Sequence, residues 1–314
     1  MSALTRLTQF FSKSESKHQI GVSIGPAGLM LCYLNEKNKV SYQELPLEIM
    51  APQKVVNDTD TKTVSTSVTK LLTKNKVSGN CHLVLPASHY QMVQVDKPNV
   101  PKDEIVAALK WQVKDLVTIE VDDLIVDYFD VPVLLAGNPK VNVVCASKTF
   151  LTAMVGSINQ GEIKLSTIST EEFAFLSLLP RQDDAILLVC QQRNAEIVLL
   201  IVQNGQLYFH RRLRGFAQIS QQSEQELAMG ITDSLSLEIQ RSTDYFERQL
   251  KQSPIKSIQV FIPSDNEQYL VDKLGLNTNI LVQLLALPEQ YQGQRKYGLA
   301  IGASLLSTLE QSDA

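Results

Sequence analysis

Ile20–Leu34 reads IGVSIGPAGLMLCYL: an apolar run, a short turn of small residues, and a second apolar run. Ala185–Tyr208 repeats the plan as AILLVCQQRNAEIVLLIVQNGQLY. This second stretch adds an Asn204-Gly205 turn, whose positive φ angles Asn and Gly accept at low cost. Two similar strand-turn-strand segments, each followed by helical sequence, predict a duplicated α/β fold.

Two such halves resemble the actin-like ATPase superfamily, in which each half contributes one phosphate loop to a nucleotide cleft. The resemblance implies an actin-like (ribonuclease H-like) two-lobed α/β fold. In that family the first turn of each half usually reads Asp-x-Gly, whereas here the positions read Ser23-Ile24-Gly25 and Gln191-Gln192-Arg193. Ser and Gln supply no negative charge for a hydrated magnesium ion. Each lost charge-assisted contact costs roughly 1.5 to 3 kcal/mol, so we expect a degenerate cleft.

The composition excludes several functional classes. The chain has 314 residues, 44% hydrophobic and 20% charged, with a net charge of -4, so it has no basic excess for nucleic acid. Its four cysteines stand singly in apolar runs, which predicts buried thiols and no metal site or disulfide framework. Neither a membrane-spanning apolar run nor a signal-peptide pattern is found, so we expect a cytoplasmic protein.

The segment 1–18 carries an apolar stripe at helical spacing, made of Leu4, Leu7, Phe10 and Phe11, among basic residues. Two interpretations stay open for this N-terminal amphipathic tail. It is either a helix packed on the body or a frayed end, or it is a helix that docks on a membrane surface or a partner.

Hydrophobic periodicity divides the rest of the chain into two lobes and an insertion. The first lobe is expected at 19–80 and 147–180, a small α+β subdomain at 81–146, and the second lobe at 181–314. The resemblance implies that the small subdomain is SHS2-like. The closing helix 295–309 either stays with the second lobe or packs back on the first. Further helices are expected at 64–74, 102–117, 148–159, 171–179, 234–251 and 268–274, the last ended by Gly275. Further strands are expected at 81–86, 90–95, 127–133, 141–146 and 256–263, with a turn at 136–139.

The inserted subdomain makes the resemblance more specific. Val84-Leu85-Pro86, then Glu104–Val113, then Asp122–Val131 closely resemble PilM, the cytoplasmic actin-like component of type IV pilus assembly. Tyr297–Gly302 is similar to the last helix of that family, and the opening Met1–Glu48 is most similar to the PilM-type proteins of MSHA pilus systems. The individual motifs are short, and their order along nearly the whole chain carries the resemblance.

The resemblance implies a nucleotide site of which only part is present. Glu238, Arg241 and Ser242 match the family helix that faces the adenosine, although an ion pair between helix positions i and i+3 explains the first two equally well. Where a Gly-rich adenosine loop should follow, the chain reads Pro263-Ser264-Asp265-Asn266, with no Gly for close backbone approach. ATP with Mg is the one cofactor that the resemblance implies. We expect a pseudo-ATPase, with a slow ATPase or ATP-gated switch as the alternative.

The resemblance also implies a partner, because PilM accepts the N-terminal tail of the inner-membrane protein PilN between its first subdomain and its insertion. Trp111, with Lys110 and Lys114 beside it, either borders that groove or, as large aromatics usually do, packs in a core. The expected role is a scaffold peripheral to the inner membrane that links this tail to the assembly motor ATPase. Self-association into filaments is a third possibility. We expect no catalytic residues, because the histidines stand alone and the Glu171-Glu172 pair suits a helix start.

Overall fold

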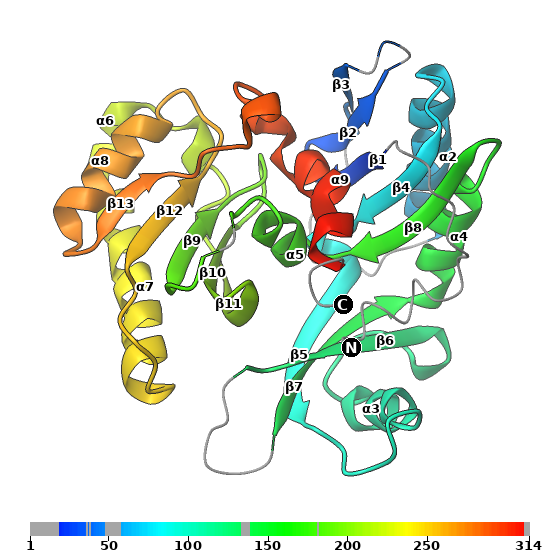
Figure 1. Cartoon of the computed structure of the whole chain (residues 1–314), viewed down its shortest axis with the longest axis horizontal. Helices are drawn as coiled ribbons and strands as arrows, with labels where there is room; N and C mark the ends of the chain where they lie inside the picture. The colour runs from blue at the N-terminus through cyan, green and yellow to red at the C-terminus, as the bar shows by residue number, and fades with distance from the viewer. Residues whose placement is uncertain are drawn as a thin grey trace. The chain divides into compact units, whose positions relative to one another are not determined.

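The chain contains two compact units, each built on its own five-stranded sheet (Figure 1). The computed structural model describes residues 19–35, 37, 39–47, 58–132, 139–180 and 182–310. Unit 1 runs up to Ser177 and resumes at Leu299, whereas unit 2 is Leu178–Gly298. The tail 1–18 and most of the expected turn at 136–139 lie outside the described residues, so those predictions stay predictions.

The sheet of unit 1 contains the hairpin predicted from Ile20–Leu34. Its strand order is β3-β2-β1-β4-β8, with bounds Val40–Leu45, Gly28–Leu34, Gln19–Gly25, Gly79–Val84 and Ile163–Ser169. Strands β1, β4 and β8 are parallel, and their register places Ser23 beside Val84 and Val84 beside Ser169. Since parallel strands present their carboxyl ends at one edge, the ends of β1, β4 and β8 share one edge of this sheet.

Both faces of this sheet are covered. Alternate β1 residues such as Val22 and Ile24 join a core with helices α2 (Asp58–Lys74) and α4 (Lys148–Ile158). Gly21 points to the other face, where helix α9 (Gly298–Glu310) crosses close to the strand. Helix α5 (Glu171–Leu176) packs beside α9, since the Ser177 hydroxyl lies 2.7 Å from the carbonyl oxygens of both Ala174 and Gly302 and shares its one proton between them. The closing helix therefore lies with unit 1.

The inserted subdomain is a three-stranded antiparallel sheet with one helix. The strand order is β5-β7-β6, with bounds Tyr90–Asp96, Lys140–Ser147 and Leu124–Asp130. Helix α3 (Ile105–Val113) covers one face and packs on Leu124, Val126 and Tyr128 of β6. The helix is shorter than the predicted 102–117. Because side chains alternate along a strand, Ile125, Asp127 and Phe129 lie on the opposite face of the subdomain.

The sheet of unit 2 contains the second predicted hairpin. Its strand order is β11-β10-β9-β12-β13, with bounds Gln206–Leu213, Ile197–Gln203, Ile186–Cys190, Ser257–Phe261 and Leu281–Leu284. Asn204 and Gly205 have φ angles of 51° and 70°, which confirms the predicted turn between β10 and β11. The helices are α6 (Glu224–Glu226), α7 (Thr232–Asp244) and α8 (Glu267–Asn277), with helical turns Leu227–Ile231 and Tyr245–Gln249 flanking α7.

One predicted helix end is wrong. Gly275 lies inside α8, which continues to Asn277, and the Thr278 N–H donates to the Leu274 carbonyl at 3.0 Å. The φ angle of Gly275 is not positive, so this glycine does not form a left-handed helix end. A glycine near the end of a periodic run is therefore an insufficient stop signal in this chain.

The prediction of buried thiols is confirmed. Cys32, Cys81, Cys145 and Cys190 are all free and buried. Burial raises the pKa of Cys32 and of Cys145 to about 12, and it raises the pKa of Cys81 as well. Cys32, Cys81 and Cys145 are therefore protonated at neutral pH and act as small apolar side chains in the cores.

Two buried histidines of unit 1 give the protein a predictable sensitivity to acid. Burial lowers the pKa of His82 to about 4 and that of His89 to about 4, against an ordinary value of 6.5, although Asp60 raises the latter slightly. His82 Nε2 lies 2.6 Å from Gln19 Oε1, and the His89 ring lies 4.2 Å from the ring of Phe150. Both imidazoles are therefore neutral in the folded unit.

We expect the free energy of unfolding of unit 1 to fall as the pH drops from 7 to 5. The unfolded chain binds protons below its ordinary pKa of 6.5, whereas the folded unit does not until about pH 4. The loss at pH 5 should be about 2 kcal/mol for each histidine. Urea unfolding at both pH values measures it. A variant with His82→Gln and His89→Gln should lose most of this dependence, and an equal loss in that variant would contradict the assignment.

Candidate functional site

The first phosphate-loop position lies at the carboxyl-end edge of the unit 1 sheet. Ser23 is fully buried, and its hydroxyl has no hydrogen-bond partner among the described residues. Gly25 pairs with Gly28 across the β1–β2 turn, and Gly28 has a φ of 124°. The Ser169 hydroxyl on β8 is likewise buried and unpartnered within the described part of the chain. These small hydroxyls leave the edge polar but uncharged at the position where the resemblance expects an Asp.

The second phosphate-loop position is used to hold its own loop. Gln191 is buried, and its Nε2 donates hydrogen bonds of 2.8 Å to the carbonyls of Ala195 and Phe216. Its backbone N–H donates to the Phe261 carbonyl at 2.8 Å. Arg193 is exposed. The Gln191 amide thus satisfies backbone carbonyls, a task for which an acceptor-only carboxylate is unsuited.

The residues matched to the adenosine-facing helix interact within unit 2. Glu238 Oε2 lies 2.7 Å from a guanidinium nitrogen of Arg211, and Glu238 also pairs with Arg241. The Ser242 hydroxyl is buried and donates to the Glu238 carbonyl at 2.9 Å, within the same helix. The ion pair that the spacing of Glu238 and Arg241 predicts is therefore present.

The segment that replaces the Gly-rich loop is tied down by an ion pair. Pro263 and Ser264 are partly buried and follow β12. Glu267 accepts a hydrogen bond from the Ile262 N–H at 2.6 Å and pairs with Arg295, whose Nε and one terminal nitrogen each lie 2.6 Å from a carboxylate oxygen. The Arg295 guanidinium stacks 4.5 Å from the centre of the Phe261 ring. Carboxylate, guanidinium and ring thus pack over the end of β12.

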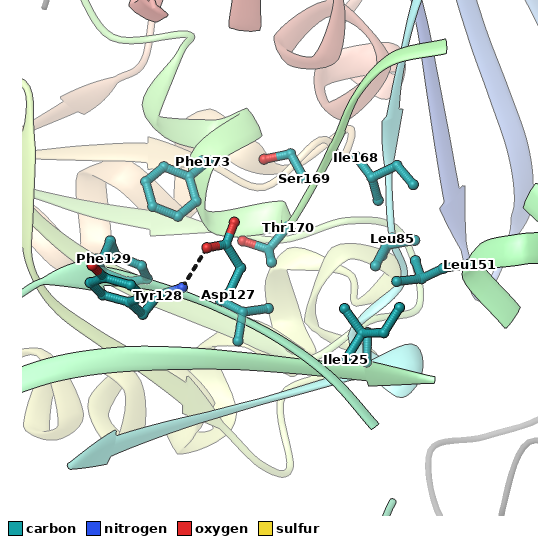
Figure 2. A pocket seen from close by; sticks show the side chains of 12 residues that line it. Leu85, Ile125, Asp127, Tyr128, Phe129, Leu151, Ile168, Ser169, Thr170 and Phe173 are labelled. Atoms are coloured by element: carbon teal, nitrogen blue, oxygen red, sulfur yellow. Dashed lines mark hydrogen bonds between the residues drawn. The ribbon is translucent and has the colours of Figure 1, made fainter. Parts of the chain in front are cut away.

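A pocket within unit 1 lies between the inserted subdomain and the sheet of the first lobe. Strands β6 and β8 both border it, and each is an edge strand of its sheet in the described part of the chain. Figure 2 shows aromatic side chains toward one end of the pocket and aliphatic ones toward the other, with polar groups between them. The lining side chains come from β6, β7, β8, α4 and α5, and from the residues that follow β4 and β8: Leu85, Ile125, Asp127, Tyr128, Phe129, Val144, Ala146, Leu151, Ile168, Ser169, Thr170 and Phe173.

The lining has three chemical parts. Phe129 and Phe173 meet edge to face, with ring centres 5.0 Å apart. The hydroxyls of Ser169 and Thr170 are buried and have no hydrogen-bond partner among the described residues. Asp127 is the one charged residue of the lining, and its carboxylate accepts a hydrogen bond of 2.8 Å from the Tyr128 N–H. An apolar pocket with a few convergent polar groups is typical of a binding site.

Lys110, Trp111 and Lys114 do not line this pocket. They lie on or just after α3, which covers the other face of the three-stranded sheet. Trp111 is 63% exposed, which excludes the core role, and the Lys114 ammonium lies 5.8 Å from its ring centre. The two residues form an exposed cation–π pair on the surface of the inserted subdomain.

The structure reveals residues that the sequence reasoning did not single out. Asp127 and Phe173 line the pocket. The Glu171-Glu172 pair begins α5, as predicted for a helix start, but both residues are buried, which the sequence reasoning did not anticipate. Glu172 accepts a hydrogen bond of 2.7 Å from the Tyr90 hydroxyl, so it ties α5 to the inserted subdomain. The apolar run Phe173-Ala174-Phe175 that follows this acidic pair was a sequence signal for such burial.

Two lobes that each begin with a strand-turn-strand sheet, the first carrying an α+β insertion, define an actin-like α/β fold. No family model and no curated protein matches the sequence. Among solved structures, the fold is similar to the "PilM-PilN type IV pilus biogenesis complex", with a TM-score of 0.64 and 14% identity over 91% of this chain and 97% of that chain. At this identity the likeness shows the fold alone.

Two further structures are similar at lower scores. The cytoplasmic domain of EpsL, an inner-membrane component of the type II secretion system of Vibrio cholerae, has a TM-score of 0.47 and 11% identity over 89% of this chain and 100% of that chain. The ethanolamine utilization protein EutJ from Carboxydothermus hydrogenoformans has a TM-score of 0.49 and 10% identity over 92% of this chain and 90% of that chain.

Within the described residues, no helix is long and apolar enough to span a bilayer.

Proposed function

We propose that this protein is a scaffold of type IV pilus biogenesis, of the MSHA type, that binds the N-terminal tail of a PilN-like inner-membrane protein. In this proposal it lies at the cytoplasmic face of the inner membrane and links the tail to the assembly motor ATPase. The observation that carries the proposal is the apolar pocket bounded by two edge strands in unit 1, in a chain whose fold is similar to a PilM–PilN complex.

The pocket suits an extended segment better than a compact ligand. Edge strands present unpaired backbone N–H and C=O groups, which an added strand satisfies while its alternate side chains enter pockets. The apolar lining provides the side-chain pocket here, and the unpartnered hydroxyls of Ser169 and Thr170 provide further hydrogen-bonding groups. A short protein tail can pair its backbone with an edge strand, place apolar side chains in the pocket and form hydrogen bonds with the two hydroxyls.

The nucleotide-site residues support a scaffold over an enzyme. Gln191 holds backbone carbonyls, and Glu238 is paired with two arginines. A slow ATPase or ATP-gated switch is the second candidate, favoured by the buried Ser23 hydroxyl, which has no partner among the described residues.

We expect a fluorescent peptide with the sequence of the tail of the PilN-like partner to bind the full chain saturably. Phe173→Ala should weaken this binding about thirtyfold, because a buried aromatic anchor contributes about 2 kcal/mol. Fluorescence anisotropy measures both affinities. Trp111→Ala is the matched control, because this aromatic lies outside the pocket.

The controls separate the rival sites and functions. Loss of binding in Trp111→Ala, with Phe173→Ala unchanged, would place the tail on the exposed α3 surface with Lys110 and Lys114. Repeating the titration with magnesium-ATP tests the switch, since an ATP-gated protein should change its tail affinity. Absence of any saturable binding would contradict the scaffold proposal. An apparent molar mass from light scattering that rises with protein concentration would indicate self-association.

A further inference from the structure

We infer that unit 2 carries a second docking surface, formed by α7, α8 and the turn before α7, which binds a basic amphipathic helix of a partner protein. This α7–α8 surface comprises Met229, Asp233, Leu237, Asp272 and Leu276. It lies within unit 2, whereas the pocket of the proposed function lies within unit 1. The inference is therefore independent of the tail-binding pocket.

Exposed apolar side chains gather on this part of unit 2. Among the described residues, seven large apolar side chains are exposed, and four of them belong to α7, α8 and the segments next to these helices. Met229 is 81% exposed in the turn before α7, Leu237 is 55% exposed on α7, and Leu276 is 79% exposed near the end of α8. The fourth, Leu281, begins β13, the strand that follows α8 (Figure 1). Apolar side chains that gather on one surface, unlike single ones, mark a binding site.

A contact between the two helices brings Leu237 and Leu276 to one surface. The side-chain nitrogen of Asn277, the last residue of α8, donates to Asp233 on α7 at 2.9 Å. Leu276 precedes Asn277 in the chain, and Leu237 lies one helical turn after Asp233. Since residues four apart share a helix face, Asp233 lies beside Leu237, and Asp272 lies beside Leu276. Each of these leucines therefore has a carboxylate as its neighbour.

The two carboxylates have no cation partner in the part of the chain that the structure describes. Both aspartates are exposed, and both accept hydrogen bonds from neutral amides: Asp233 from Asn277, and Asp272 from Gln268 at 2.8 Å. Lys273, the neighbour of Asp272 in the chain, lies over the Tyr269 ring instead, 5.4 Å from its centre. A lysine or arginine of a partner would meet uncompensated negative charge here.

Charge decides between the possible occupants of the surface. The two aspartates repel a membrane that contains anionic lipids. A second copy of the chain docked through the same surface would bring like charges together, which is unfavourable. A helix with an apolar stripe flanked by Lys or Arg matches both the exposed leucines and the aspartates, and helices dock on apolar surfaces through such stripes. The flexible Met229 side chain can adapt to the end of that stripe.

The test uses a phage-displayed library of helical peptides, selected on the full chain. Peptides that bind the unaltered protein but not the double variant Leu237→Ser with Leu276→Ser should carry an apolar stripe flanked by Lys or Arg. Fluorescence anisotropy should show the best of them binding the double variant at least about thirtyfold more weakly, because two apolar anchors are lost. Asp272→Lys should weaken the same peptide about tenfold by replacing attraction with repulsion, and added salt should weaken binding to the unaltered protein.

Leu116→Ser is the matched control, because Leu116 is a similarly exposed leucine, at 57%, in unit 1. It should leave the affinity of the peptide unchanged, and circular dichroism should show all variants folded. Recovery of no such peptide, of peptides with acidic flanks, or only of peptides that require Phe173 would overturn the inference. Binding to anionic vesicles, or a dimer, that the double variant abolishes would assign the surface to lipid or to a second copy and would overturn it as well. Loss of tail binding in Phe173→Ala alone tests the proposed function and leaves this inference unaffected.

Discussion

Replacement of Gly21 by alanine is expected to lower the free energy of unfolding of unit 1 by about 3 kcal/mol or more. Gly21 lies in β1, the central strand of the five-stranded sheet, on the face that α9 covers. A methyl group at this position would stand 1.8 Å from the Ala300 carbonyl oxygen and 2.7 Å from the Ser304 nitrogen. Both atoms belong to the backbone of α9, so no side-chain rotation relieves the clash.

Neither partner in this contact can move freely. Strand β1 is hydrogen-bonded on both sides, to β2 and β4. Helix α9 is held against α5, where a methyl group on Gly302 would meet the Ala174 carbonyl oxygen at 2.1 Å. A shift that makes room at Gly21 must therefore disturb the sheet or a second tight contact of the same helix. Protein interiors transmit such strain because they are close-packed.

Gly156→Ala is the matched control for this prediction. Gly156 lies in α4 of the same unit, and a methyl group there would meet nothing within 4 Å. Alanine at this exposed helical position should stabilise the unit by about 0.5 to 1 kcal/mol. Urea unfolding followed by circular dichroism compares the two variants, and hydrogen exchange of the β1 amides localises the effect. A loss below about 1 kcal/mol for Gly21→Ala would show that α9 does not pack on β1 as described.

The sequence predicted the hairpins well because their information is local. The two apolar runs and small-residue turn of Ile20–Leu34, and the Asn204-Gly205 turn, each specify a strand pair without reference to the rest of the chain. Both hairpins are present, and the inserted strands β5 and β7 lie within one or two residues of their predicted ends. Strand β8 (Ile163–Ser169) was not predicted, because four of its seven residues are polar: one Lys, one Thr and two Ser.

The pocket could not be predicted from the sequence, because its residues come together only through tertiary structure. Asp127 and Phe173 are separated by two strands and a helix, and neither belongs to a motif with fixed spacing. Trp111 drew attention as the single tryptophan, yet it lies on the exposed side of α3. The rarity of tryptophan drew attention to the α3 face of the inserted subdomain. The pocket lies on the opposite face of its sheet, where alternate side chains of β6 point.

Arg295→Met is expected to destabilise unit 2 by about 3 to 5 kcal/mol. The Glu267 side chain is only 6% exposed, and Arg295 supplies two of the three 2.6 Å contacts to its carboxylate, the third being the Ile262 N–H. Arg295 also donates to the carbonyls of Leu285 and Val260, at 2.6 and 3.3 Å. Methionine keeps an apolar stem over the Phe261 ring but removes every one of these hydrogen bonds. The variant therefore leaves a buried carboxylate and buried carbonyls without their cation.

A double variant separates the cost of the unpaired charge from the value of the ion pair. Glu267→Gln combined with Arg295→Met leaves no buried charge, and the glutamine oxygen can still accept the hydrogen bond from the Ile262 N–H. It should therefore be more stable than Arg295→Met alone, because replacing both partners of a buried ion pair destabilises a protein less than removing one partner and leaving the other charge unpaired. Arg248→Met is the surface control: Arg248 is 80% exposed and pairs with Asp244 at 3.3 Å, so its loss should change stability by less than about 0.5 kcal/mol.

Hydrogen exchange gives this prediction a local readout. The Ile262 amide should exchange faster in Arg295→Met if the carboxylate turns toward solvent to regain water, because its acceptor is Glu267. The loop Pro263–Ser264 stands where the resemblance expects a nucleotide-binding loop, and Glu267 joins the residue just before this loop, Ile262, to Arg295. If Arg295→Met were as stable as the unaltered protein, the loop would have to be held by contacts other than this ion pair.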